Sequence, residues 1–556
     1  MSFQKYAIIF FFSKKLFKIF LFLKAIVRAY PDIWKQKMLT VVQSAKCIGI
    51  KALPVNVEVN ISSGIGIHLV GLADAAVRES LLRTITALQA VGFRIPGKKI
   101  VINLAPADLH KKGSGYDLPI ALGIIASSGQ AELPGLGKYL IMGELGLDAS
   151  VRKIPGAMPV VELAKENGCQ GCILPEESAM EAAEYGGCTI FGVKRLGEVI
   201  RILEEKEDCE NLRIVWNPDS SIWQDRPHTG PYDSGTMDFA DIYGQDGAKR
   251  GLEIAAAGGH NVLLIGPPGS GKSSLAKATA AILPPMTTEE AVETSKIYSV
   301  AGKGGTRCGL IRRRPFRAPH YSSSLSAILG GGSDNIMPGE ISLAHNGVLF
   351  IDEFCEAPKR MTEALRAPME DRSITISRLK SKVEYPASFM LIAATNPCPC
   401  GYYGDGDRCT CSPGKRAAYL SRLSGPIMDR IDIHLWLSPV DASKLITRKK
   451  EEPSAEIAAR VLNAREIQKE RFRGEGIHTN AEMTARLTEI HCRTGKESSA
   501  FLKRMITAER LSARACSRIL KVARTIADLA GEEDIGLQHI SEASRYRLLD
   551  KMELMI

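Results

Sequence analysis

The chain lacks a long uncharged hydrophobic run of the kind that crosses a membrane. Residues 6–27 are rich in Phe, Ile and Leu, but Lys14, Lys15, Lys18 and Lys24 interrupt them. A membrane-spanning helix needs about 20 apolar residues with few charges, so we expect no stable membrane insertion. No small-residue cleavage site follows, which argues against a secretory signal. A basic amphipathic helix at a membrane surface stays open as an alternative.

Disulfide bonds are also not expected. The thirteen cysteines form no disulfide framework, and no export signal accompanies them. Most stand singly among apolar or mixed residues, so we interpret them as core thiols. Together these observations predict a cytoplasmic protein.

The chain carries little net charge outside its N-terminal end. Its formal net charge is +10, and residues 1–37, with eight Lys or Arg and one Asp, contribute +7 of it. Only +3 is left for the rest of the chain. Overall charge therefore gives no argument for a nucleic-acid partner, and such a site has to come from local basic patches.

A glycine-rich segment is the most informative part of the sequence. It follows the apolar run 262–265 and precedes residues 274–281, whose pattern is typical of a helix. A strand, a glycine-rich loop and Gly-Lys-Ser opening a helix form the context of a phosphate-binding loop. Backbone N–H groups and the helix dipole bind phosphate oxygens there. We predict a nucleoside triphosphate site, in which Lys272 reaches the β- and γ-phosphates and Ser273 holds Mg²⁺. The loop consists of Gly266, Pro267, Pro268, Gly269, Ser270, Gly271, Lys272 and Ser273.

Two further apolar strands end in polar residues. Residues 348–351 lead into Asp352 and Glu353, and Asn396 closes the run that begins at Phe389. One such strand is ordinary core packing, but three in order suit phosphoryl transfer, which needs positioning and charge neutralisation. We predict that Asp352 holds the Mg²⁺ water shell, Glu353 polarises the attacking water and Asn396 senses the γ-phosphate.

A cluster of four cysteines stands out because all four fall within fourteen residues. They form the pairs Cys398-Pro-Cys400 and Cys409-Thr-Cys411. This inventory suits a tetrahedral structural Zn²⁺ site. Because Cys-X-Cys pairs are tighter than the usual Cys-X-X-Cys knuckle, reduced loop cysteines and a redox pair stay open as alternatives.

Several longer segments resemble the AAA+ ATPases, in particular their magnesium-chelatase-like YifB/ComM branch. The resemblance is carried by RPFRAPH, PGEISLAHNG, NPCPCG and LSGPIMDRID, at residues 314–320, 338–347, 396–401 and 423–432. It runs from about Met38 to the C-terminus. Because it starts at Met38, we interpret residues 1–37 as a non-homologous extension that an upstream start codon adds.

The resemblance implies roles for individual residues. The phosphate loop would be Walker A, the Asp-Glu pair Walker B and Asn396 sensor 1. Arg430 would be the arginine finger that one subunit offers to the γ-phosphate of its neighbour, with Arg422 as a rival. Arg514 would be sensor 2. The implied cofactors are ATP and Mg²⁺.

The segment before the ATPase resembles the Lon-like domain of the same branch. Lon peptidases need a nucleophilic serine and a lysine that activates it. The resemblance places Gly115 at the nucleophile position and Met158 at the base position. Ser114 is one position away, and neither Lys111 nor Lys112 can be assumed to substitute. We expect no peptidase activity, and a binding or assembly role instead.

The predicted fold is α/β, and it is divided along the chain. After the extension come a Lon-like α+β domain of the S5 domain 2 type at 38–215, a linker rich in Pro, Ser, Asp and Gly at 216–240, the AAA+ core at 241–440 and a helical lid with sensor 2 at 441–556. Apolar spacing predicts lid helices at 455–472, 481–494, 497–511 and 513–529. In the first domain we predict strands at 55–61 and 99–103, and helices at 73–90, 119–127 and 159–167.

Two basic features of the ATPase core are candidates for contact with nucleic acid. One is the cluster of Arg312, Arg313 and Arg314, together with Arg317 and His320. The other is a predicted hairpin of strands 373–378 and 383–385 with residues 379–382 at its tip. In related ring helicases such a hairpin projects into the pore, where Lys380 and Lys382 would track phosphates. Solvated surface charge is the alternative for both features.

These expectations combine into one functional prediction. The chain would be an Mg²⁺-dependent AAA+ ATPase that forms a homo-oligomeric ring, a hexamer, and translocates on or remodels DNA. The resemblance to the ComM group implies branch migration of recombination intermediates during uptake of foreign DNA. The alternatives are a magnesium-chelatase motor subunit, which the Lon-like domain and the cysteine cluster argue against, and an ATP-dependent protein remodeller.

Overall fold

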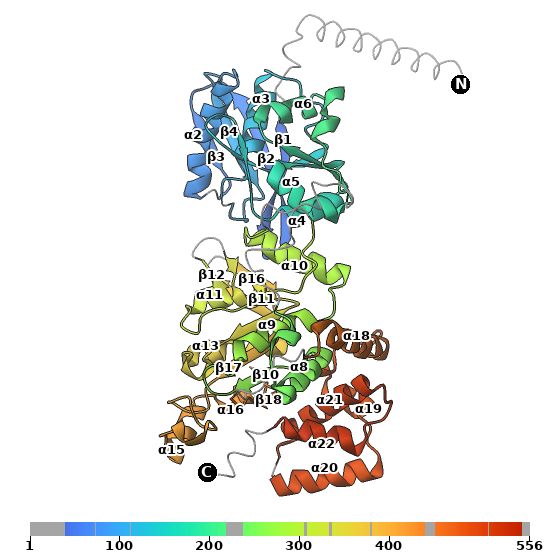
Figure 1. Cartoon of the computed structure of the whole chain (residues 1–556). Helices are drawn as coiled ribbons and strands as arrows, with labels where there is room; N and C mark the ends of the chain where they lie inside the picture. Colours follow the sequence, from blue (N-terminus) through green and yellow to red (C-terminus); the bar gives the residue numbers. More distant parts are fainter. Residues whose placement is uncertain are drawn as a thin grey trace, which may run out of the picture. The chain divides into compact units, whose positions relative to one another are not determined.

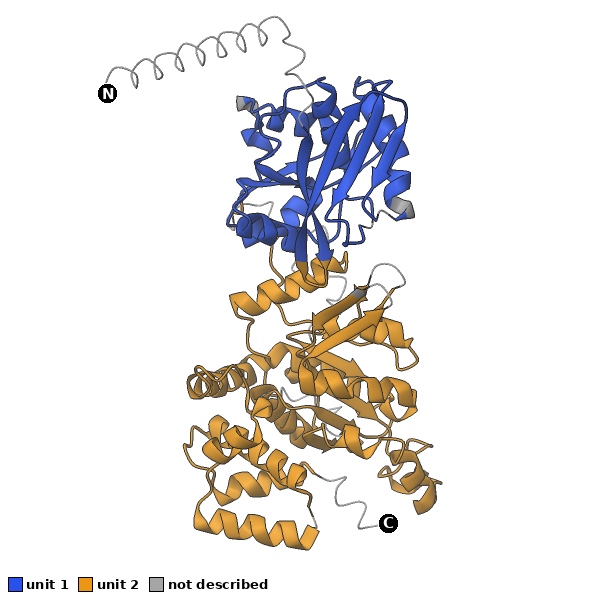
Figure 2. Ribbon diagram, turned by 180° about the vertical axis from the view of Figure 1, so that it is seen from behind, with its two compact units in different colours: residues 1–47, 52–215 blue, residues 48–51, 216–556 orange. Residues whose placement is uncertain are grey.

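The computed structural model describes residues 39–72, 74–111, 113–217, 237–304, 309–332, 336–378, 381–439, 451–509 and 511–547. The predicted extension, Lys112, Lys380 and most of the predicted linker lie outside these residues. The described chain divides into two compact units, one within residues 1–47 and 52–215 and one within 48–51 and 216–556 (Figure 2). None of the helices among these residues is long and apolar enough to cross a lipid bilayer.

The first unit contains two main sheets. A four-stranded sheet has the order β1-β2-β4-β3, from Thr40–Ile48, Lys51–Ser62, Lys99–Ala105 and Ile67–Val70. Buried residues alternate along the central strands β2 and β4, which is the pattern of strands with one face on a core. Helices α2 (Ala75–Ala90) and α3 (Asp117–Ser128) contribute to the same core. The second sheet is parallel, with the order β5-β8-β9, from Tyr139–Ile141, Gly171–Pro175 and Thr189–Val193, and is accompanied by α4 (Ala157–Glu166), α5 (Glu176–Ala182) and α6 (Leu196–Leu203).

The second unit is built on a parallel five-stranded sheet (Figure 1). Its order is β11-β14-β17-β10-β18, from Phe316–Arg317, Val348–Ile351, Met390–Thr395, Val262–Ile265 and Ile433–Trp436. Strands β10, β14 and β17 are buried along their whole length, because helices and loops cover both faces of a parallel sheet. This explains why they appear in the sequence as continuous apolar runs.

A group of C-terminal helices shares a core with this sheet. They are α18 (Ser454–Arg471), α19 (Ala485–His491), α20 (Lys496–Glu509), α21 (Ala513–Ala530) and α22 (Leu537–Arg545). The helix predicted at 481–494 is present but shorter, so its predicted bounds are wrong. A short 3₁₀ turn, Asn480–Glu482, precedes Thr484, whose side chain accepts a hydrogen bond from Leu487 N at 3.3 Å and starts α19 as a separate helix. Phe239, which the sequence places in the linker, is fully buried in the core of this unit.

The predicted hairpin is present, with the first strand as predicted and a longer second strand. Strands β15 (Ser373–Arg378) and β16 (Ser381–Pro386) pair antiparallel, with Ser377 opposite Lys382 and Arg378 opposite Ser381. The expectation that residues 379–382 form the tip is therefore wrong for Ser381 and Lys382, which continue the ladder. The side chain of Lys382 is exposed.

Candidate nucleotide site

Three polar segments come together at the carboxyl ends of strands in the parallel sheet. Strands β10, β17 and β14 are neighbours, with Ile265 opposite Thr395 and Ile351 opposite Ala393. The phosphate-loop segment, the Asp-Glu pair and Asn396 directly follow these strands. Because the strands are parallel, all three segments leave the sheet on the same side, where open α/β sheets bind ligands.

The phosphate-loop segment needs glycine for its backbone. Gly269 and Gly271 have φ angles of 78° and 88°, in the left-handed region that glycine adopts without strain. A β-carbon added at either position would meet no atom within 4 Å, so backbone conformation and not space demands glycine here. Gly271 directly precedes α9 (Lys272–Ile282), which places the N–H groups of the first helical turn beside the loop. Such an arrangement suits a phosphate group.

Lys272 lies across this loop. Its Nζ donates to the carbonyl oxygens of Gly266 at 2.7 Å and Pro267 at 3.0 Å, and to Oδ1 of Asn396 at 3.3 Å. Burial lowers the pKa of Lys272, while the nearby Asp352 carboxylate acts in the opposite direction. The lysine thus links the loop to the end of β17, and phosphate oxygens could replace the carbonyl acceptors.

Ser273 and Asp352 form a pair of oxygen donors. The Ser273 hydroxyl donates to Oδ2 of Asp352 at 3.0 Å. A hydroxyl and a carboxylate are ligands that Mg²⁺ accepts, so the residues present fit this ion. Glu353 is exposed beside them and has a positive φ of 50°, an uncommon conformation for a residue other than glycine. The carboxylate of Glu353 is therefore exposed, and in the chain it directly follows Asp352.

The three candidate arginines all have carboxylate partners in the same chain. Arg430, with 15% of its side chain exposed, pairs with Glu370. Arg422, 53% exposed, pairs with Glu356 at 2.7 Å. Arg514 is 74% exposed and pairs with Asp429 at 3.2 Å. None of these partners belongs to the phosphate loop.

Two residues that the sequence did not indicate position parts of this site. Gln245, at the start of α8 (Asp246–Gly258), donates through Nε2 to the carbonyl oxygens of Ser270 at 3.2 Å and Ser438 at 2.7 Å. Asn261 donates to the Arg430 carbonyl at 2.9 Å and accepts from Leu391 N at 2.8 Å. A Gly-Gln-Asp sequence before a helix was the only local signal for Gln245, and none marked Asn261.

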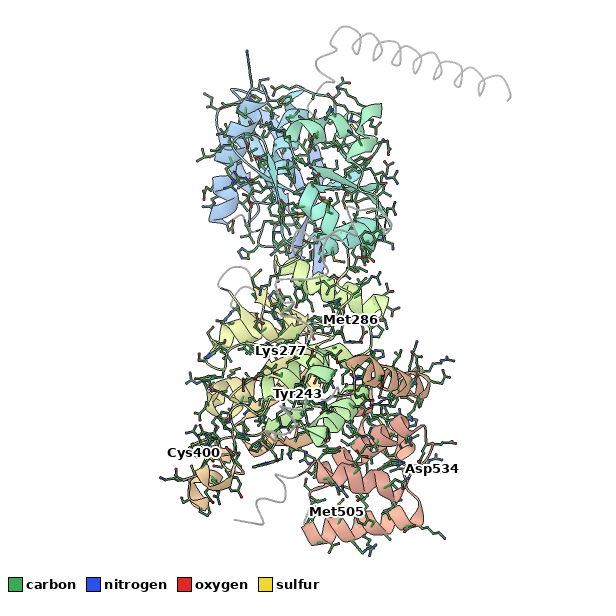
Figure 3. All side chains as sticks on the ribbon, viewed as in Figure 1. Tyr243, Lys277, Met286, Cys400, Met505 and Asp534 are labelled. Atoms are coloured by element: carbon green, nitrogen blue, oxygen red, sulfur yellow. The ribbon has the colours of Figure 1, made fainter. Side chains whose placement is uncertain are left out.

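The four cysteines predicted to bind a metal come together. The Sγ atoms of Cys398 and Cys400 are 3.3 Å apart, and Cys409 lies 3.8 and 3.7 Å from them. With Cys411, all four Sγ atoms lie within 4.8 Å of one another. A tetrahedral site with Zn–S bonds of about 2.3 Å needs S···S distances of roughly 3.8 Å, so these thiols can hold such an ion. Figure 3 shows Cys400 on the loop beside α15 (Pro413–Leu420).

The thiols of this cluster have different proton affinities. Burial raises the pKa of Cys398 to about 11, and its hydrogen bond with the neighbouring Cys400 adds to this. Backbone N–H donation at Tyr402 and the contact with Cys398 lower the pKa of Cys400 to about 6.

In the first unit, the residues at and beside the aligned peptidase positions have other contacts. A β-carbon on Gly115 would lie 3.0 Å from Cε of Met142, so little room is left for a nucleophile. The Ser114 hydroxyl donates to Glu144, and Lys111 Nζ donates to the Pro106 carbonyl. Ser114 and Lys111 thus bind different partners in this unit.

Two members of the arginine cluster, Arg314 and Arg317, bind groups of their own chain. Arg314 donates to Glu290 at 2.9 Å, to the Pro284 carbonyl at 2.6 Å and to the Asn346 carbonyl at 2.8 Å. Arg317 is buried and forms a bidentate pair with Glu340. Nucleic-acid contact by Arg314 and Arg317 is therefore wrong as a prediction, because both guanidinium groups bind their own chain. Arg312, Arg313 and His320 are exposed.

Together, the parallel sheet, the glycine loop and the convergent Lys, Ser, Asp, Glu and Asn side chains define an ATPase of the AAA+ type. Comparisons with known proteins agree. Residues 238–445 match the family model described as magnesium chelatase, subunit ChlI; residues 57–178 match that of subunit ChlI of Mg-chelatase; and residues 451–547 match that of the ChlI C-terminal part.

Individual relatives identify the branch of this family to which the chain belongs. The chain is 41% identical over 518 residues to the protein YifB of Salmonella typhimurium, covering 92% of this chain and 98% of YifB. It is 39% identical over 516 residues to the competence protein ComM of Haemophilus influenzae, again covering 92% and 98%. Over 213 residues it is 28% identical to the DNA replication licensing factor Mcm6 of Drosophila melanogaster, which covers 36% of this chain and 22% of Mcm6. The chain belongs to the YifB/ComM family of magnesium-chelatase-like AAA+ proteins.

Proposed function

We propose that this protein is an Mg²⁺-dependent ATPase that assembles into a hexameric ring and translocates on or remodels DNA in the cytoplasm. The observation that carries the ATPase part is the contact of Lys272 with both the phosphate loop and Asn396 at the carboxyl edge of the sheet. Membership of a family that includes a competence protein supports the DNA part.

Different residues of the chain have different roles in ATP hydrolysis. The loop N–H groups and Lys272 bind the phosphates, and Asn396 registers the γ-phosphate through the same lysine. Ser273 and Asp352 would hold Mg²⁺, which neutralises charge on the phosphates when bound. Exposed Glu353 orients the attacking water. Arg430 acts on the site of the neighbouring subunit; within its own chain it pairs with Glu370, which is not part of the phosphate loop.

The remaining parts of the chain have supporting roles in this proposal. The first unit is a Lon-like domain without peptidase chemistry that serves binding or assembly. The C-terminal helices form the lid, with Arg514 as sensor 2. The four-cysteine cluster holds one structural Zn²⁺ per chain, because its S···S distances fit a tetrahedral ion. Elemental analysis that finds no metal after purification without chelators or oxidants would reject the zinc site.

The hairpin β15–β16 is the proposed DNA contact. Arg378 and Lys382 are exposed on opposite strands near its turn. Basic side chains on a projecting hairpin can follow a phosphate backbone without reading its sequence. Contacts of this kind weaken as salt rises, because each one releases counterions from the nucleic acid.

The test measures ATPase rates with single-stranded, duplex, forked and four-way-junction DNA. We expect stimulation by at least one form, and we expect replacement of Lys380 and Lys382 with Ala to leave basal hydrolysis intact. The same variant should weaken stimulation for all sequences and flatten its salt dependence. Lys359→Ala on α13 (Lys359–Ala364) is the matched control, since this lysine is also exposed. Indifference of the wild-type protein to every DNA form would end the DNA proposal and favour a chelatase motor or a protein remodeller.

A further inference from the structure

The four-cysteine loop is in contact with the phosphate loop. A β-carbon on Gly401 would lie 3.1 Å from Cδ of Pro268 and 3.9 Å from Cγ of Asn396. Gly401 also has a φ of +85°, which strains any other L-residue. The backbone next to Cys400 therefore rests against the phosphate loop and against the residue that accepts a hydrogen bond from Lys272.

The same loop has a second point of attachment, at the end of strand β18. The ring of Tyr403 meets Trp436 edge-on at 6.0 Å between centroids, and a β-carbon on Gly404 would lie 3.3 Å from the Trp436 ring. Trp436 ends β18 and pairs with Ile265, the residue that directly precedes the phosphate loop. The cysteine loop thus contacts Pro268 and Asn396, which follow two of the strands that carry the site, and Trp436 at the end of the neighbouring strand β18.

This loop has little core of its own. Within residues 397–412, only positions 397, 398 and 401 are buried, and the single regular element is the 3₁₀ turn Gly406–Arg408. A segment of this length with so few buried side chains needs another constraint to keep one shape. A metal ion bound by four side chains supplies such a constraint, because its binding energy becomes folding energy.

We propose that the metal held by Cys398, Cys400, Cys409 and Cys411 keeps Gly401 against Pro268, so that metal occupancy controls ATP affinity and the position of Asn396. This inference rests on the zinc site proposed above. It assigns the cluster a role in regulating nucleotide binding, beyond local stability of the loop. Displacement of Pro268 or Asn396 by about 1 Å would be enough for a large loss in the chemical step.

The experiment uses the full chain and measures two quantities for each variant: zinc per chain by elemental analysis, and equilibrium binding of a fluorescent ATP analogue with Mg²⁺. Cys409→Ser should lose zinc and bind the nucleotide roughly tenfold more weakly or worse. Gly401→Ala should keep zinc but weaken nucleotide binding, because its new β-carbon presses on Pro268. Gly414→Ala, which meets no atom within 4 Å, and Cys188→Ser in the first unit should change neither quantity.

The outcomes separate the two levels of the proposal. Wild-type protein without zinc overturns the metal site itself. Zinc present in the wild type, with normal nucleotide affinity in Cys409→Ser and Gly401→Ala, overturns the coupling and leaves the zinc site standing. If Cys409→Ser does not fold, Gly401→Ala decides alone: normal affinity with retained zinc rejects the coupling, and weakened affinity with retained zinc supports it.

Discussion

Arg430 forms an ion pair with Glu370 of its own chain, on helix α14 (Arg366–Asp371). The backbone carbonyl of Arg430 is fixed at the same time by the side chain of Asn261, which also holds Leu391 in β17. The backbone at Arg430 is thus tied to the sheet, while the charge of the guanidinium is balanced by an exposed carboxylate. In the proposed ring, the γ-phosphate of a neighbouring subunit would take the place of that carboxylate.

The finger assignment predicts complementation between two inactive variants. Arg430→Ala should lower ATP hydrolysis on the order of 10³-fold, because a finger stabilises charge in the transition state. Mixed with Glu353→Gln subunits, it should regain activity, since some sites then combine an intact glutamate with an intact finger. Steady-state hydrolysis across mixing ratios measures this.

Arg422→Ala serves as the comparison for this experiment. Arg422 pairs with Glu356, which is close in sequence to Glu353. The variant Arg422→Ala should lose less ATPase activity than Arg430→Ala. If Arg422→Ala regained activity when mixed with Glu353→Gln and Arg430→Ala did not, Arg422 would be the arginine finger.

Binding and hydrolysis should separate at the phosphate loop. Lys272→Ala should abolish nucleotide binding, since it removes the cation that spans the loop and Asn396. Glu353→Gln should retain binding and slow hydrolysis by roughly 10²- to 10⁴-fold, the usual contribution of a general base. Equilibrium binding and phosphate release, measured on the same samples, test both statements. Tight nucleotide binding by Lys272→Ala would contradict the assigned phosphate contact.

The first unit should have no peptidase activity. Gly115 stands where a nucleophile would be, and Met142 occupies the adjacent space. ATP-dependent cleavage of unfolded casein is the measurement, and Ser114→Ala is the control that would reveal a displaced nucleophile. Cleavage that disappears in Lys272→Ala would show that the unit is a working protease.

The parts of the site that the sequence predicted are local. The phosphate loop, the Asp-Glu pair and Asn396 each follow an apolar strand, so a short window of sequence contains both the position and the chemistry. The four-cysteine cluster is local in the same sense, because all its ligands lie within one loop.

The parts that the sequence did not predict depend on distant partners. Arg314 and Arg317 appear as a basic surface run until Glu290 and Glu340, more than twenty residues away, are seen to bind them. Gln245 reaches Ser438 across 193 positions. Charge and spacing alone cannot show which side chains meet after packing. In the sequence, an arginine that forms an internal ion pair therefore looks the same as an arginine on a solvated surface.

The link between the sheet and the C-terminal helices should depend on pH through Asp432. This buried carboxylate accepts from Asn261 N at 3.2 Å, lies 3.4 Å from Nδ1 of His260 and pairs with Arg518 on α21. Burial alone would raise the pKa of Asp432, but Arg518 and His260 outweigh it and hold that pKa well below its usual range.

A carboxyl group whose pKa is depressed in the folded state stabilises that state above its unfolded pKa of about 3.9, and the contribution is lost as pH falls below that value. Asp432→Asn should therefore lower the free energy of unfolding by about 3–5 kcal/mol at pH 7, the cost of leaving a buried partner unpaired. The difference from wild type should shrink below about pH 4. Urea unfolding followed by circular dichroism at both pH values measures it, with exposed Asp534→Asn as the control. An equal difference at pH 3 and pH 7 would show that Asp432 contributes through packing and not through its charge.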